Sequence, residues 1–255
     1  MTEDIEHILK SWAYDPGEDL VVRIIDGKDG QKLQMRIDMG IIQMALDGNP
    51  TGEGPENFET WFEYYQHQQK QVEDNDVEDF FTLDEESCQT LRREAVHYYY
   101  RYLSLMKLGD YKRVICDTDR NCRVFAFMKK YAASEMDRWS LDQYRPYVIM
   151  MNTRANASLT IKEGQSSKDS KTPLEKALEF IDEGIGKIIG FYEEYGISSE
   201  AENSIELSVL KALKTEFIRN IPMSPEELLK KAVSDERFED AAALRDIIRL
   251  KHKSN

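Results

Sequence analysis

Cysteine and histidine are both scarce in this sequence, and their scarcity argues against most metal and nucleophilic chemistry. The chain has three cysteines and four histidines among 255 residues. Cys116 and Cys122 are too far apart along a helix to share a metal easily, and no cysteine pair has C-x-x-C spacing. We therefore expect reduced thiols, a reducing compartment, no metal ion and no cofactor.

Catalytic signatures are missing as well. The sequence contains no Walker A phosphate loop and no legible nuclease, Ser/His/Asp or Cys/His arrangement. Glu94 and His97 form an E-x-x-H pair, but a di-iron site needs a second such pair and two further glutamates. We therefore interpret this pair as neighbours on a helix surface, and the protein as a non-enzyme.

Long apolar runs are absent too. No run approaches the eighteen or more residues that a membrane-spanning helix needs. The first seven residues are acidic and lack the basic region and apolar stretch of a signal peptide. We expect a cytoplasmic protein without a membrane segment.

Positive charge is in short supply, with a formal net charge of −14 and no more than two consecutive basic residues. Affinity for nucleic acid depends on Lys and Arg that neutralise phosphates, so direct nucleic-acid binding is not expected. Residues 73–86 carry eight acids and no base. This stretch could hold a metal or a basic partner, but we favour a solvated connector followed by the acidic first turn of a helix.

The N-terminal part of the chain has the pattern of a small sheet. Residues 3–12 predict a short helix, and a β-branched run follows at 20–25. Polar and apolar residues then alternate strictly over 32–39, and 41–46 supplies a third apolar stretch. Period-two alternation next to a glycine-rich turn is typical of hairpins, so we predict an antiparallel meander over 20–46.

The rest of the chain has helical periodicity. Four S/T-x-x-E/Q capping boxes mark predicted helix starts: Thr82–Glu85, Ser140–Gln143, Thr172–Glu175 and Ser224–Glu227. The predicted helices cover residues 57–72, 84–108, 111–132, 141–162, 173–194, 203–219 and 225–233.

A weak internal repeat over residues 87–195 resembles tetratricopeptide-like helical hairpins. Gly109 and Gly164 mark helix–turn–helix joints, and Val114 and Ala177 occupy the position of the small residue that packs the second helix on the first. Stacked hairpins and a plain helical bundle explain this pattern about equally well, so the fold class is mainly α with either arrangement of the body.

Aromatic residues gather at 97–102, which reads His-Tyr-Tyr-Tyr-Arg-Tyr. This run covers a whole helix circumference, so some rings must be partly exposed, where tyrosine suits a binding groove. If the hairpins stack, an inner groove would draw on polar residues that can hold a peptide: Arg120, Asn121, Arg145, Asn152 and Arg154. The competing interpretation is solvated helix faces with local salt bridges.

The C-terminal part predicts two short helices, at 225–233 and 237–252, around a polar turn at 234–236. Apolar and small residues lie on one stripe of each helix. A hairpin this short cannot bury its apolar face fully by itself, so the remainder must dock on something.

This hairpin resembles the UVR motif, found in the repair proteins UvrB and UvrC and in certain adaptor and AAA+ chaperone proteins. The residues that carry the resemblance are Leu229, Ala232, Phe238, Glu239, Ala241, Ala242, Leu244, Arg245, Asp246 and Ile248. The family's final leucine falls one position early here, at Leu250. The resemblance implies that Phe238, Ala241 and Ala242 pack the seam between the helices, and that Arg245 and Asp246 make polar contacts. It also implies a non-catalytic hairpin that pairs with another UVR hairpin or docks on a partner.

These observations predict three parts: a short helix with a β meander (1–55), a helical body (56–221) and a UVR-type hairpin (222–255). We expect a non-catalytic adaptor or scaffold protein. Its expected partners are another UVR-hairpin protein, an AAA+ chaperone or a second copy of the chain. The alternative is an accessory factor of UvrABC-type nucleotide excision repair, which contacts UvrB or UvrC and reaches DNA directly or through them.

Overall fold

The computed structural model describes most of the chain, which divides into two compact units. The units are Met1–Lys211 and Ala212–Asn255. The described residues are 4–17, 20–74, 80–164, 172–219, 229–230, 233–235, 237–240, 242–243 and 245. The meander and the helical body, predicted as separate domains, belong to one unit.

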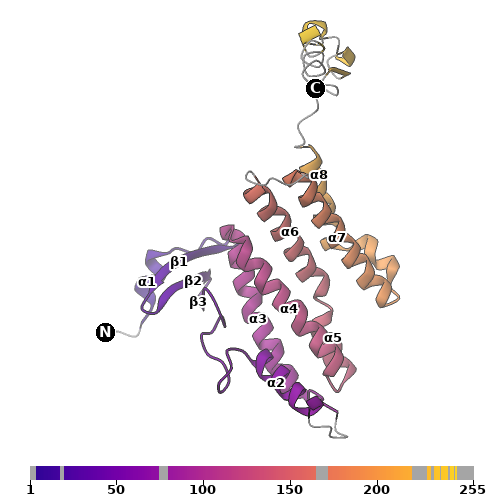
Figure 1. The fold of residues 1–255 in the computed structure, drawn as a ribbon. Coiled ribbons are helices and arrows are strands. Elements are labelled where there is room, and N and C mark those ends of the chain that lie inside the picture. Colours follow the sequence, from indigo (N-terminus) through magenta and orange to yellow (C-terminus); the bar gives the residue numbers. More distant parts are fainter. Residues whose placement is uncertain are drawn as a thin grey trace. The chain divides into compact units, whose positions relative to one another are not determined.

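The first unit begins with a short helix and a three-stranded sheet (Figure 1). Helix α1 (Glu6–Ser11) precedes strands β1 (Val21–Gly27), β2 (Gly30–Ile37) and β3 (Gly40–Ala45). The strands are antiparallel in the order β1-β2-β3, with Ile24 opposite Leu33 and Leu33 opposite Met44. The predicted meander is therefore confirmed.

The two faces of β2 differ from the simple alternation of its sequence. Leu33 and Met35 are buried as expected, but the polar Gln34 and Arg36 are buried as well. The segment after α1 contacts Arg36, because the carbonyl of Trp12 accepts a hydrogen bond from Arg36 Nε at 3.0 Å. Gln34 is bonded to the neighbouring strands: it accepts from Arg23 Nε at 2.9 Å and donates to Gln43 at 2.8 Å. Both faces of the central strand are thus covered.

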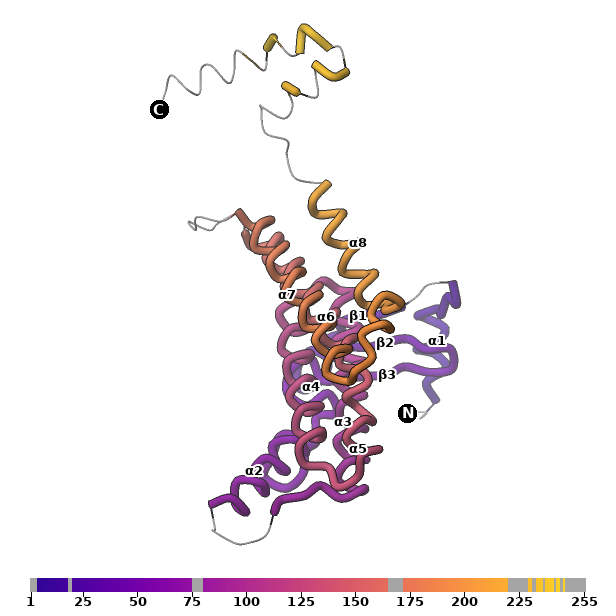
Figure 2. Tube along the Cα trace, turned by 90° about the vertical axis from the view of Figure 1, so that its right-hand side faces the viewer, coloured from indigo at the N-terminus to yellow at the C-terminus, as the bar shows by residue number. Residues whose placement is uncertain are grey.

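Helices make up the rest of the unit, and the mainly α fold class is confirmed (Figure 1). They are α2 (Trp61–Asp74), α3 (Glu85–Leu108), α4 (Tyr111–Tyr131), α5 (Glu135–Asp142), α6 (Arg145–Glu163), α7 (Pro173–Glu194), the 3₁₀ helix η2 (Ser198–Asn203) and the start of α8 (Ile205–Arg219), whose residues after Lys211 belong to the second unit. Helix α3 packs on α4, α4 on α6, and α6 on α7 (Figure 1 and Figure 2). Packing that follows the chain order is what stacked hairpins produce.

The joints of these hairpins match the sequence pattern at several points. Gly109 ends α3 in the left-handed conformation, with φ of 71°. Val114 and Ala177, the predicted packing positions, are both fully buried. Thr172 and Glu175 form a complete capping box at the start of α7, as predicted.

Two other predicted caps are wrong. Helix α3 is capped by Asp84, which accepts from the Ser87 amide, rather than by Thr82. Ser140 lies inside α5, which is capped by Ser134, and α6 begins only at Arg145. Aspartate and serine are both strong N-caps, so neighbouring candidates compete and tertiary packing selects one.

The predicted cap at 224–227 lies outside the described residues. Among the helices that the structure describes, none is long and apolar enough to cross a membrane.

Candidate functional site

The C-terminal hairpin was the most specific prediction, and the structure describes five of the ten residues that carry the UVR resemblance. Leu229 is half-buried, and Phe238 exposes 66% of its surface. Glu239, Ala242 and Arg245 are exposed as well. Phe238 and Ala242 are therefore exposed among the described residues, and their packing in a seam between two helices stays a prediction.

The other predicted hairpin residues lie outside the described residues: Ala232, Ala241, Leu244, Asp246 and Ile248.

The predicted peptide groove is not assembled as expected. Arg120 and Asn121 are buried between α3 and α4, with 7% and 1% exposure. Arg120 pairs with the Glu94 carboxylate, and its Nη1 donates to the side-chain oxygen of Asn121 at 3.1 Å. The Asn121 amide donates to the Ala95 carbonyl at 3.0 Å. Both side chains therefore hold two helices together, and their polar groups face each other.

The three remaining groove candidates make local contacts of their own. Arg145 donates to Asp142 at 3.0 Å and to Glu194 at 2.6 Å. Asn152 donates to Thr118 and Asp119, and the Arg154 guanidinium lies 3.7 Å from a methionine sulfur of its own helix. The competing interpretation was solvated helix faces with local salt bridges, and the ion pairs of Arg145 with Asp142 and Glu194 fit it.

Glu94 has a structural task that its E-x-x-H spacing did not suggest. Its carboxylate accepts hydrogen bonds from the backbone amides of Trp61 and Phe62, at 2.7 and 3.3 Å. Glu94, which belongs to α3, therefore caps the first turn of α2. The same carboxylate pairs with Arg120. Burial lowers the pKa of His97, with the Arg93 charge adding to the shift. Within the described ranges, no cluster of three metal-ligating side chains is found.

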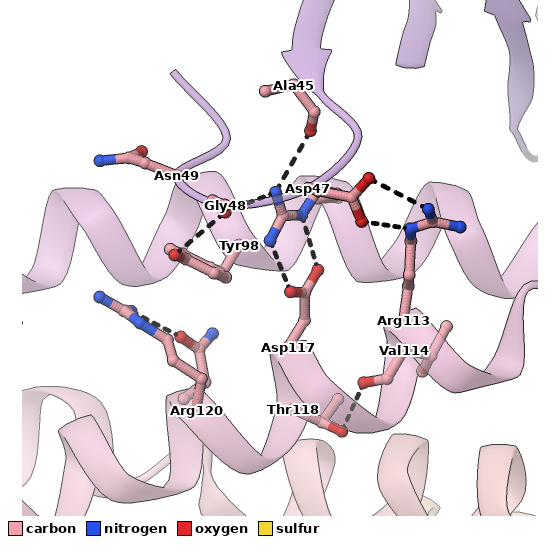
Figure 3. Close-up of polar contacts among 12 residues, drawn as sticks. Ala45, Asp47, Gly48, Asn49, Tyr98, Arg113, Val114, Asp117, Thr118 and Arg120 are labelled. Atoms are coloured by element: carbon pink, nitrogen blue, oxygen red, sulfur yellow. Dashed lines mark hydrogen bonds and ion pairs between the residues drawn. The ribbon is translucent and has the colours of Figure 1, made fainter. Parts of the chain in front are cut away.

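A second buried ion pair joins the helices to the loop after the sheet (Figure 3). Arg101 donates to both carboxylate oxygens of Asp117, at 2.8 and 2.7 Å. Its Nη1 also donates to the carbonyls of Gly48 and Ala45, at 2.8 and 3.2 Å. Burial raises the pKa of Asp117 even though Arg101 opposes this effect. One guanidinium thus connects α3, α4 and the end of β3.

An outer ion pair lies beside this buried one (Figure 3). Arg113 donates to Asp47 at 2.7 and 3.1 Å, and to Asp110 at 2.6 Å. The Arg113 guanidinium lowers the pKa of the Asp47 carboxyl through its hydrogen bond. Asp47 is largely exposed, so this pair contributes less than the buried one.

The tyrosine run does line a cavity, which we call the tyrosine pocket. Its volume is about 460 Å³. It lies among α3, α4, α5 and the start of α6, and its lining residues are Ala95, Val96, Tyr99, Tyr100, Tyr102, Asn121, Phe125, Leu141, Tyr144, Tyr147 and Val148. The prediction that partly exposed tyrosines of residues 97–102 suit a binding groove anticipated its α3 wall. Tyr144 and Tyr147 were not anticipated, because only the fold brings the start of α6 to α3.

Aromatic contacts organise this pocket. The Tyr99 ring centroid lies 5.5 Å from that of Tyr100, 5.6 Å from that of Tyr102 and 6.0 Å from that of Tyr147. Tyr102 is fully buried, whereas Tyr144 at the rim is 55% exposed. Burial raises the pKa of Tyr147 to about 12, so this phenol is neutral at physiological pH. The pocket therefore has a deep aromatic wall and an accessible aromatic rim.

No family model, curated protein or solved structure matches this chain. The resemblance of residues 224–251 to the UVR motif therefore rests on those residues alone. The functional interpretation rests on the chemistry of the hairpin residues and of the tyrosine pocket.

Proposed function

We propose that this protein is a non-catalytic adaptor or scaffold whose C-terminal hairpin docks on a partner protein. The observation that carries the proposal is the exposure of apolar side chains in the Ala212–Asn255 unit. Phe238 is 66% exposed and Val233 is 52% exposed. Large exposed apolar side chains on a small unit favour burial against another surface.

The polar residues around Phe238 support the same proposal. Arg237 pairs with Asp240 at 3.0 Å and with Asp235 at 3.4 Å, and all three side chains are about half exposed. An aromatic anchor beside exposed charges has the composition of a protein interface, in which a desolvated centre supplies affinity and a polar rim supplies orientation.

The partner classes follow from the UVR resemblance: another UVR-hairpin protein, an AAA+ chaperone or a second copy of this chain. We place this activity in the cytoplasm. Cys88, Cys116 and Cys122 are all free thiols, which suits a reducing compartment.

Partner capture by the full-length protein tests the proposal. Wild type, Phe238→Ala and Phe180→Ala are immobilised, and proteins retained from a lysate of the source cells are identified by mass spectrometry. Phe180 is the matched control because it is an exposed phenylalanine on α7, at 38%. The partner is then purified, and its affinity for each variant is measured.

We expect Phe238→Ala to weaken binding of the purified partner by at least about 30-fold, as for an interface hot spot of 2 kcal/mol or more. Phe180→Ala should bind like wild type. Equal affinity of Phe238→Ala and wild type would contradict hairpin docking. Identification of UvrB or UvrC as the partner would assign the adaptor to excision repair.

A further inference from the structure

The tyrosine pocket differs from the rest of this highly charged protein in having an uncharged lining. Asp, Glu, Lys and Arg make up 32% of the chain. Among the described residues, the eleven that line the pocket include none of these. A charged ligand would lose hydration there without gaining a partner of opposite charge, so the pocket favours an uncharged occupant.

The hydrogen-bonding groups of the pocket favour a compact occupant over an extended peptide. Extended peptides are held largely through main-chain hydrogen bonds to strand edges or to polar side chains. Asn121, the one amide side chain in the lining, donates to the Ala95 carbonyl and accepts from Arg120. The other side-chain polar groups of the lining are tyrosine hydroxyls. These can orient one polar group of a ligand but do not form a ladder for a peptide backbone.

The shape and the rings of the pocket define the ligand further. A volume of about 460 Å³ falls within the range of sites that hold small molecules, about 300–1,000 Å³. Tyr99 contacts rings on both α3 and α6, and Tyr144 stands at the rim. Tyrosine rings on two sides of a cavity provide faces and edges for another aromatic ring.

We propose that the tyrosine pocket binds a compact, uncharged aromatic small molecule. This site lies in the Met1–Lys211 unit, apart from the hairpin residues that carry the proposed docking function. A result that contradicts hairpin docking therefore does not contradict ligand binding in the tyrosine pocket, and the reverse also holds.

Three size-matched probes test the chemistry on the full-length protein. 2-Naphthol is aromatic and neutral, decahydro-2-naphthol is neutral but not aromatic, and 2-naphthoate is aromatic but charged. Binding is followed by chemical shifts of methyl groups in the lining, at Ala95, Val96 and Val148. We expect 2-naphthol to bind with a dissociation constant of about 1 mM or tighter.

The other two probes should bind more weakly for different reasons. Loss of ring stacking should weaken decahydro-2-naphthol about two- to tenfold. The cost of desolvating the carboxylate should weaken 2-naphthoate about tenfold or more. Equal binding of all three probes, or no shift of the pocket methyls at saturating 2-naphthol, would overturn the proposal.

Variants at the exposed rim locate the bound probe. Tyr144→Ala should weaken 2-naphthol binding about two- to tenfold, whereas Tyr144→Phe should retain it, because the ring rather than the hydroxyl makes the contact. Val96→Trp should fill the mouth and abolish binding, and it is tolerable because Val96 is 43% exposed. Tyr14→Ala is the control, since Tyr14 is a partly exposed tyrosine outside the pocket lining.

Other occupants of the pocket would give distinct results. Dimerisation that is lost in Val96→Trp, combined with no probe binding, would assign the pocket to a second copy and overturn the small-molecule proposal. Undiminished probe binding in both Tyr144→Ala and Val96→Trp would place the probe elsewhere and overturn it as well.

Discussion

Two pairs of helices in the same unit are held together by different physical means. The α3–α4 interface contains buried charges, with Arg101 bidentate on Asp117 and Arg120 paired with Glu94. The α6–α7 interface depends on close approach at a small residue. A methyl group on Gly184 would come within 2.1 Å of Thr153 Oγ1. The buried part of the first interface is directional and polar, whereas the second depends at Gly184 on the absence of a side chain.

The difference follows from what each pair of helices must hold. Helices α3 and α4 contact backbone that belongs to neither helix: Arg101 binds the carbonyls of Ala45 and Gly48, and Glu94 binds the amides of Trp61 and Phe62. Backbone amides and carbonyls that have no partner within a helix or sheet need polar side chains as partners when they are buried. Helices α6 and α7 share one partly exposed ion pair, Arg145 with Glu194, where α6 begins and α7 ends. Further along the two helices, at Gly184, close packing joins them.

The largest effect is expected where a buried charge loses its partner. Asp117→Ala leaves the Arg101 guanidinium buried without its counter-ion, and we expect the free energy of unfolding to fall by about 3–5 kcal/mol. Urea denaturation of the full chain measures this change.

The exposed ion pair next to it is the matched control. Asp47→Ala should cost less than about 1 kcal/mol, because Asp47 and Arg113 are solvent-exposed. The double variant Arg101→Met/Asp117→Leu should recover part of the loss, since no unpaired charge remains. A cost below 1 kcal/mol for Asp117→Ala would remove the claimed difference between the two interfaces.

The next effect concerns the close approach of α6 and α7. Gly184→Ala would bring a methyl group to 2.6 Å from Thr153 Cγ2 and 2.8 Å from its Cβ, so rotation of one side chain cannot relieve the overlap. We expect the free energy of unfolding of Gly184→Ala to fall by about 1–3 kcal/mol. Thermal or urea denaturation checks this value.

Two other glycines on the same helix provide the control. Gly186 and Gly190 have open space where a Cβ would be. Alanine at either position should stabilise the protein by about 0.5–1 kcal/mol, because alanine is the better helix former. If all three substitutions stabilise equally, the α6–α7 contact is looser than the structure indicates.

A smaller effect, dependent on pH, is expected where α5 meets α3. The Ser134 hydroxyl, followed by the Arg92 guanidinium at 2.6 Å, lowers the pKa of Asp137. A carboxyl with a lowered folded-state pKa stabilises the fold above its unfolded pKa of about 3.9, and this contribution is lost as pH falls through the folded-state pKa.

Asp137→Asn should therefore lower the free energy of unfolding by about 1 kcal/mol at pH 7. The difference in this free energy between the variant and wild type should shrink progressively below about pH 4. Denaturation at a series of pH values gives the profile. A difference that stays constant down to pH 2 would show that the charge of Asp137 does not stabilise the fold.

The smallest effect on stability is expected in the hairpin. Phe238→Ala should change the main unfolding transition by less than about 0.5 kcal/mol, because the side chain is largely exposed. Phe62→Ala, at 3% exposure, should cost about 3–5 kcal/mol. Equal losses for the two variants would mean that Phe238 is part of a core.

Local patterns in the sequence predicted the elements better than their contacts. The meander and most helices of the body appear near their predicted bounds, because hydrophobic periodicity acts within one element. The short helix α5 was not predicted. The misplaced caps at Thr82 and Ser140 show where local rules fail: several nearby residues can cap a helix, and packing chooses among them.

Polar side chains show the same limit more sharply. Arg120 and Asn121 were candidates for the lining of a peptide groove, yet they are buried against Glu94 and the Ala95 carbonyl. Their polar groups can be buried because Glu94 and Ala95 of α3, each 26 residues earlier in the sequence, supply hydrogen-bond partners. No spacing within α4 contains that information.

The sequence by itself determined the fold class, the glycine joint at 109 and the capping box at Thr172, because each depends on residues a few positions apart. It also predicted that some rings of residues 97–102 are partly exposed, where tyrosine suits a binding groove. Only the tertiary structure decided that Tyr144 and Tyr147 join them and that Arg101 binds the loop after β3. Those contacts connect segments distant in the chain, and burial energies arise only once the segments meet.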